Sequence, residues 1–165
     1  MQSNYILRAR EKYESYDPSC WTKAYFDDVS GGFNVYHKLH QFSSVQGGGD
    51  VEKTVGKMLA KCSGKQVEFL AEQGDGHGMP DVMFDEQTWD IKFVNNANEN
   101  TLRLYIKDAR KADNAIFYFT NDKYDSLLSA VNREVGHLQK CNRVSEMPNI
   151  YYMDETEVLS LLWHK

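Results

Sequence analysis

The hydrophobic pattern predicts a helix that begins near Asp50 and ends at Gly64. Apolar side chains recur there at the 3.6-residue period of a helix, Asp50 can cap the first turn, and Gly64 can end the last. The apolar positions of this helix are Val51, Val55, Met58, Leu59 and Cys62.

Three short apolar runs follow this helix, and each is bounded by turn residues, so each predicts a strand. They span residues 66–70, 81–84 and 88–94. Only residues 85–87 separate the last two runs, which is a gap short enough for a hairpin.

The second half of the chain predicts alternating helices and strands. A helical stripe starts at Thr101, and a second helix can be capped by Asn121 or Asp122. The predicted strands span 114–119 and 149–153, and residues 155–163 predict a closing helix.

The order of these elements predicts an α/β fold in which helices flank a mixed sheet. Residues 1–30 are rich in aromatic side chains, and we expect short helices there, as an N-terminal arm or linker remnant. Residues 31–165 are expected to form the main domain.

The composition indicates one globular domain that is stable without a metal or disulfide framework. A chain of 165 residues with 41% hydrophobic residues can bury roughly 70% of its unfolded surface. Its three cysteines have no metal-ligand spacing, which favours a reducing compartment such as the cytoplasm. No apolar run is long enough to suggest a membrane span.

The net charge of −5 argues against a protein that coats nucleic acid, but one segment is positive. Residues 100–145 contain 8 Lys and Arg against 5 Asp and Glu, a balance of +3. Four of these cations fall at helical spacing and predict one basic stripe beside the apolar one, which can line phosphates. They are Arg103, Lys107, Arg110 and Lys111.

The strand predicted over 88–94 carries the most informative chemistry. Period-2 geometry sends Trp89, Ile91 and Phe93 to one face, expected to be the core face, and Asp90 and Lys92 to the other. The hairpin can bring Asp81 beside Asp90, and two adjacent carboxylates favour a shared Mg²⁺ or Mn²⁺ ion. Lys92 can then orient the attacking water and offset phosphate charge. Alternatively, Asp81 only caps a turn, and Asp90 and Lys92 line the solvent-exposed face of an edge hairpin.

Pro80-Asp81 followed by Asp90-Ile91-Lys92 resembles the motif of the PD-(D/E)XK nuclease superfamily. The resemblance implies a core of order α-β-β-β-α-β, here residues 50–119 with C-terminal additions, and a motif on its second and third strands. Together with His37 or His40, the chain looks most like the tRNase toxin domains of contact-dependent growth inhibition and phage head proteins.

The resemblance implies a metal-dependent endonuclease with Mg²⁺ or Mn²⁺ on Asp81 and Asp90 and with Lys92 as a catalytic residue. It also implies a further carboxylate from the first core helix, for which Glu52 is placed, and Glu68 is the competing candidate. Three histidines, His37, His40 and His77, are noted as candidates for a proton or phosphate role.

The expected substrate is nucleic acid, and tRNA is favoured through the toxin resemblance alone. Such a toxin domain implies a cognate immunity protein as partner, release from a larger toxin or phage protein, and action in the cytoplasm. The alternatives are a DNA endonuclease of restriction or repair type, and a non-catalytic nucleic-acid-binding or phage structural module.

Overall fold

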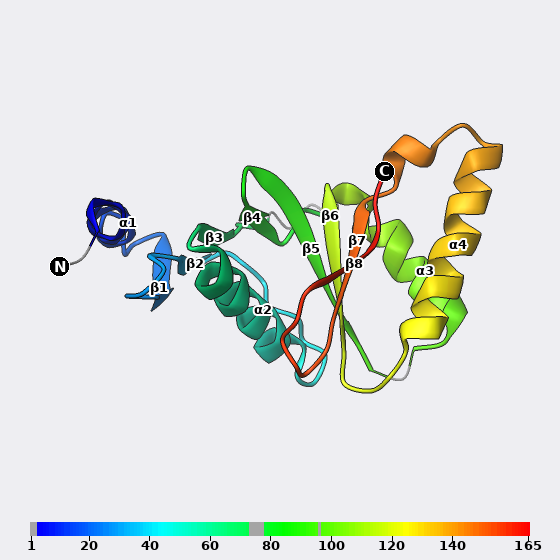
Figure 1. Ribbon diagram of the computed structural model, residues 1–165, viewed down its shortest axis with the longest axis horizontal. Coiled ribbons are helices and arrows are strands. Elements are labelled where there is room, and N and C mark those ends of the chain that lie inside the picture. Colours follow the sequence, from blue (N-terminus) through cyan, green and yellow to red (C-terminus); the bar gives the residue numbers. More distant parts are fainter. Residues whose placement is uncertain (1–2, 73–77, 96) are drawn as a thin grey trace. The chain divides into compact units, whose positions relative to one another are not determined.

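The computed structural model describes residues 3–72, 78–95 and 97–165, and Figure 1 labels its elements. The chain has a mixed α/β fold, as the sequence predicts. It divides into two compact units, Met1–Gln87 and Thr88–Lys165. None of the helices in the described part of the chain has the length and apolar character that crossing a membrane requires.

In its described residues, 3–72 and 78–87, the first unit contains two helices and four strands. Strand β2 pairs antiparallel with β1 and parallel with β3, and β3 pairs antiparallel with β4. The elements are α1 (Asn4–Glu14), β1 (Trp21–Phe26), β2 (Phe33–His37), α2 (Gly48–Ser63), β3 (Gln66–Phe69) and β4 (Val82–Phe84).

The prediction of short helices over residues 1–30 is right for α1 and wrong for β1, and β2 was not predicted. The sequence of β1, WTKAYF, is rich in the aromatic and β-branched residues that favour strands. Tyr13 of α1 packs with Phe33 and Val35 of β2 in a small core. The N-terminal segment is therefore built into the first unit.

Helix α2 begins two residues before the predicted cap, because Gly47 rather than Asp50 is its N-cap. It ends as predicted at Gly64, whose left-handed backbone (φ 69°) suits a residue without a side chain. Its buried face includes a carboxylate as well as apolar residues: Gly48, Glu52, Val55, Gly56, Met58, Leu59 and Ala60.

A two-residue turn follows β4. Asp85 and Glu86 both have positive φ, 53° and 60°, which is the combination found in the tight turns of hairpins. The turn predicted within 85–87 is confirmed.

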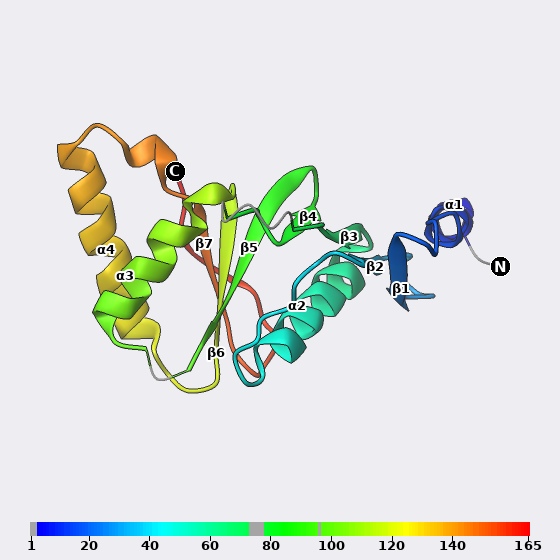
Figure 2. The ribbon, with the colours of Figure 1, turned by 180° about the vertical axis from the view of Figure 1, so that it is seen from behind.

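The described part of the second unit contains three parallel strands and one antiparallel strand. Strands β5, β6 and β7 run parallel in that order, and β8 pairs antiparallel with β7. Helices α3 and α4 lie on the same side of these strands, as Figures 1 and 2 show from opposite directions. The elements are β5 (Gln87–Val94), α3 (Glu99–Asp108), η1 (Ala109–Lys111), β6 (Asn114–Phe119), α4 (Tyr124–Lys140), η2 (Val144–Glu146), β7 (Asn149–Met153) and β8 (Ser160–Trp163).

The core of the second unit lies between the helices and the strands. Asp90, Lys92 and Val94 of β5 are in register with Ala115, Phe117 and Phe119 of β6. The four apolar residues among these six, Val94, Ala115, Phe117 and Phe119, belong to the core under α3 and α4. Asp90 and Lys92 therefore lie on the helix-covered face, and the expectation that they face away from the core is wrong.

The closing helix predicted over 155–163 is also wrong, because its second half is strand β8. Register with β7, in which Tyr151 faces Leu161 and Tyr152 faces Ser160, gives this segment backbone partners at the edge of the sheet. The segment is short and its apolar residues are nearly continuous, so periodicity alone does not distinguish a helix from a strand here.

Candidate functional site

Three charged residues form a cluster with the side chain of Asp90 on β5. The ammonium group of Lys92, two residues along the strand, lies 2.7 Å from Asp90 Oδ2. Lys111 of η1 approaches the other oxygen, with its Nζ 3.1 Å from Asp90 Oδ1. Asp108, the last residue of α3, contacts both Lys92 and Lys111 through Oδ2. We refer to these four residues as the Asp90 cluster.

Exposure within the Asp90 cluster runs from inside to outside. The side chain of Asp90 is 0% exposed, those of Lys92 and Lys111 are 15% and 20% exposed, and that of Asp108 is 54% exposed. Neither oxygen of Asp90 has a directed hydrogen bond among the described residues, although both lie within ion-pair distance of an ammonium. The two lysines are thus the charge compensation that a buried carboxylate requires.

The ion pairs of the cluster hold its charges in place. Burial lowers the pKa of Lys92, but the negative charges of Asp90 and Asp108 outweigh burial and raise it overall. Burial raises the pKa of Asp108, and the contacts with Lys92 and Lys111 more than reverse that and lower it. Two ammoniums and two carboxylates leave the cluster neutral as a whole.

Asp81, the other half of the motif, belongs to the first unit. Its side chain is among the buried charged groups, with the residue 9% exposed. Its backbone carbonyl accepts a hydrogen bond of 2.9 Å from the N–H of Leu70, which continues the β3–β4 ladder by one residue. This backbone hydrogen bond therefore holds Asp81 at the end of the β3–β4 pair.

Glu52 and Glu68 have different environments in the first unit. Glu52 is 6% exposed on the buried face of α2, whereas the sequence placed it beside the apolar stripe. Its Oε2 accepts a 2.9 Å hydrogen bond from the N–H of Ser43. Glu68 accepts a hydrogen bond from the hydroxyl of Tyr16, and burial together with this bond raises the pKa of that phenol.

Of the three histidines noted in the sequence, His40 is buried. Its Nδ1 donates a 2.8 Å hydrogen bond to the carbonyl of Leu70, the residue whose N–H binds Asp81. His40 Nε2 is buried and has no hydrogen-bond partner among the described residues. The Nδ1 atom of His37 accepts a bond from the N–H of Leu39, and His77 lies outside the described residues.

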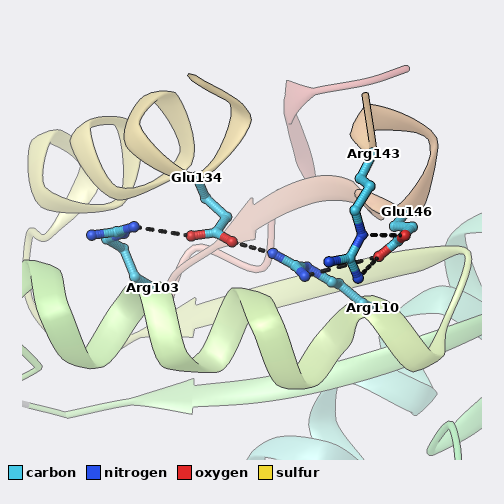
Figure 3. Close-up of polar contacts among 5 residues, drawn as sticks. All are labelled: Arg103, Arg110, Glu134, Arg143 and Glu146. Carbon is cyan, nitrogen blue, oxygen red and sulfur yellow. Dashed lines mark hydrogen bonds and ion pairs between the residues drawn. The ribbon is translucent and has the colours of Figure 1, made fainter. Parts of the chain in front are cut away.

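The predicted basic stripe is not one exposed face. Arg103 and Arg110 both contact the carboxylate of Glu134 on α4, Arg103 at 3.3 Å. Figure 3 shows Glu134 between them, and Arg110 also facing Glu146, which Arg143 binds at 2.6 Å. We call this chain of contacts the Glu134 ladder.

The reason for this correction is the packing of α3 against α4. The stripe lies beside apolar residues that α4 covers, so long side chains next to them meet α4 instead of solvent. Lys111 forms ion pairs with Asp90 and Asp108. Of the four predicted cations, only Lys107 is exposed.

Glu134 and Asp108 are the residues that the sequence analysis missed. Glu134 is fully buried and lies three residues after Val131 and four before Leu138, which both face the core. A carboxylate on the apolar stripe of a helix signals a buried ionic partner, and this signal was present in the sequence.

Four carboxylates are buried in the described part of the chain. They are Glu52, Asp81, Asp90 and Glu134. Three of these four are the residues that the sequence singles out as catalytic. Aspartate and glutamate are rarely buried unless they are paired or bind a metal, so this coincidence requires a chemical reason.

No group of three or more metal-ligating side chains is found within 3–72, 78–95 and 97–165. Comparisons with family models, curated proteins and solved structures return no match to the chain. Any functional conclusion therefore depends on the residues themselves.

Proposed function

We propose that the chain is a metal-dependent endonuclease of the PD-(D/E)XK type that cleaves phosphodiester bonds, with RNA as the favoured substrate. The observation that carries the proposal is the burial of the three carboxylates that the motif selects, Glu52, Asp81 and Asp90. The element order from α2 to β6 is also α-β-β-β-α-β, the order that the motif implies.

The donor chemistry of these residues suits a hard divalent cation. Carboxylate oxygens are the preferred protein ligands of Mg²⁺ and Mn²⁺. Asp81 and Asp90 are the proposed ligands and Glu52 the assisting carboxylate, but both oxygens of Asp90 are ion-paired to lysines. A cation at Asp90 therefore has to compete with an ammonium, and when bound it would supply Lewis-acid polarisation of the phosphate.

Lys92 has the geometry of a residue that acts between the carboxylate and the substrate. Its Nζ lies 2.7 Å from the buried Asp90, and its side chain keeps 15% exposure toward solvent. An ammonium fixed in this way can orient a water molecule and offset the charge that develops on a phosphate.

The experiment is cleavage of total RNA, purified tRNA and plasmid DNA, with and without Mg²⁺. The variants are Asp81→Asn, Asp90→Asn and Lys92→Met, with Lys140→Met as the matched lysine control at an exposed position in the last turn of α4. We expect discrete tRNA fragments only with Mg²⁺, loss of cleavage in the three site variants, and wild-type cleavage in the control.

Each other outcome has a defined meaning. Cleavage at wild-type rates in Asp90→Asn or Lys92→Met would reject the assigned residues. Efficient plasmid cutting with intact tRNA would replace the toxin hypothesis, including its cognate immunity protein, by a DNA endonuclease. Absence of cleavage of every substrate would favour the non-catalytic module.

A further inference from the structure

The two lysines of the Asp90 cluster share two carboxylates that differ in their accessibility. On the inner side, each oxygen of Asp90 contacts a different ammonium, at 2.7 Å and 3.1 Å. On the outer side, the single oxygen Oδ2 of Asp108 contacts both ammoniums, that of Lys111 at 3.5 Å. Asp90 thus holds two positive groups close together, and Asp108 covers them from solvent.

Asp108 is a replaceable partner in a way that Asp90 is not. Its side chain is 54% exposed, so it can move into water without leaving a buried charge unsolvated. It is also the last residue of α3, and a carboxylate at the C-terminal end of a helix is disfavoured by the helix dipole. The lysine contacts are what hold it there.

We propose that Lys92 and Lys111 form a binding site for one phosphate group, whose oxygen takes the position that the Asp108 carboxylate occupies. A phosphate presents several charged oxygens and can contact both ammoniums, as one carboxylate oxygen does here. The inference rests on the proposed function in one respect, since it takes the phosphate to be one in the backbone of a nucleic acid.

Although the four charges of the cluster cancel, it can bind an anion because Asp108 can leave the two lysines. With Asp108 in place the four charges cancel, and with Asp108 turned to solvent the lysines keep one uncompensated positive charge beside Asp90. The bound anion restores neutrality. Asp108 therefore acts as an internal competitor, and its removal should strengthen anion binding.

The test measures binding of inorganic phosphate and of a five-nucleotide oligouridylate by calorimetry, in EDTA at low salt, so that no cleavage takes place. We expect Asp108→Asn to lower the Kd for both probes by about two- to fivefold, the range for losing a partly exposed ion-pair competitor. Asp125→Asn, an exposed carboxylate in the first turn of α4, is the control for net charge and should leave both values unchanged.

A second variant tests whether the anion lies between the lysines. In the Asp108→Asn background, Lys111→Met should abolish the gain, while Lys140→Met, at an exposed position in the last turn of α4, should retain it, with folding checked by circular dichroism. Equal Kd values in Asp108→Asn and Asp125→Asn, or a gain that survives Lys111→Met, would overturn the site. A gain for phosphate without one for oligouridylate would overturn the nucleic-acid assignment.

This test can fail independently of the nuclease proposal. Anion binding without any cleavage in Mg²⁺ would leave the phosphate site standing and reject the enzyme. Cleavage by the wild-type protein without any effect of Asp108→Asn on binding would support the nuclease and reject the phosphate site.

Discussion

Glu134 determines the orientation of two arginines on the neighbouring helical segment. Its carboxylate is fully buried on α4 and binds Arg103 and Arg110, whose side chains are 27% and 20% exposed. A buried carboxylate with two guanidinium partners is stable only as a set, because loss of one member leaves the others charged and poorly solvated. Since Lys111 pairs with Asp90 and Asp108, three of the four cations that the sequence assigned to substrate have a partner within the protein.

Replacing Glu134 by Ala is expected to lower the free energy of unfolding by about 3 kcal/mol, since two partly buried arginines lose their counter-ion. Urea unfolding followed by circular dichroism measures the change. The matched variant is Arg143→Ala, at the exposed end of the Glu134 ladder, and should stay near wild type. Equal stability of Glu134→Ala and wild type would contradict this account of the ladder.

Asp90 and Lys92 are likewise expected to be coupled in their contributions to the free energy of unfolding. Asp90→Ala leaves two partly buried ammoniums with only the exposed Asp108, and should cost about 2–4 kcal/mol of stability. Adding Lys92→Met should return part of this loss, because the double variant buries one unpaired charge fewer. A double variant that loses the sum of the two single losses would show that the pair is not coupled. Activity measurements on Asp90 variants therefore need a parallel unfolding curve.

Two glycines, one inside a helix and one directly after a helix, are expected to respond in opposite ways to replacement by alanine. Gly136 lies inside α4 with nothing within 4 Å of an added Cβ, whereas a Cβ on Gly64 would lie 2.8 Å from the carbonyl oxygen of Ser30. Gly136→Ala should raise the free energy of unfolding by about 0.5–1 kcal/mol through lower backbone entropy of the unfolded chain.

Gly64→Ala should instead lower the free energy of unfolding by about 1 kcal/mol or more, because its φ of 69° and the contact with Ser30 both oppose a side chain. Thermal and urea unfolding of both variants measure these changes. The same sign of change in the two would contradict the element boundaries given for α2 and α4.

The elements that the sequence predicts well are those with a clear period and clear ends. Strands β6 and β7 have the predicted bounds, and α2 ends at the predicted glycine. Strand β8 was missed because four residues at a sheet edge are specified by their partner, β7, and not by their own pattern. The same is true of β1 and β2, which pair with each other.

The candidate site was predictable in its residue types and not in its pairings. The alternation along β5 correctly places Asp90 and Lys92 on one face, but which face the helices cover depends on the crossovers to β6 and β7. Lys111 and Asp108 join the cluster through η1 and the end of α3, which no spacing rule brings to a strand. Helical spacing predicts which side chains share one face of an isolated helix. It does not predict which acidic residues of other elements pack against that face.

At the scale of the whole molecule, charge is organised by internal pairing more than by segment totals. The segment 100–145 has a balance of +3, but Arg103, Arg110, Lys111, Arg133 and Arg143 all lie in ion pairs. The positive potential available to a nucleic acid is therefore smaller than the count suggests. This favours local recognition of a phosphate over a broad electrostatic surface.

The buried imidazole of His40 makes the stability of the whole chain depend on pH near neutrality. Burial lowers the pKa of His40, although the bond to the Leu70 carbonyl and the charge of Glu72, 3.5 Å away, act in the opposite direction. The unfolded chain thus binds a proton at a pH where the folded chain does not. The stability from neutral His40 is complete above the unfolded pKa of about 6.5 and is lost as the pH falls through the folded pKa.

We therefore expect the free energy of unfolding to decrease from pH 7.5 to pH 5.5, a range above that in which most paired carboxylates titrate. His40→Phe keeps an aromatic ring beside Phe42 and Phe69, at centroid distances of 4.6 and 5.1 Å for the native ring, and should reduce this decrease. The comparison is between pH values within each variant, so the lost bond to Leu70 cancels. His137→Gln, at an exposed position of α4, should keep the wild-type decrease, and an equal decrease in all three proteins would assign the pH dependence to other groups.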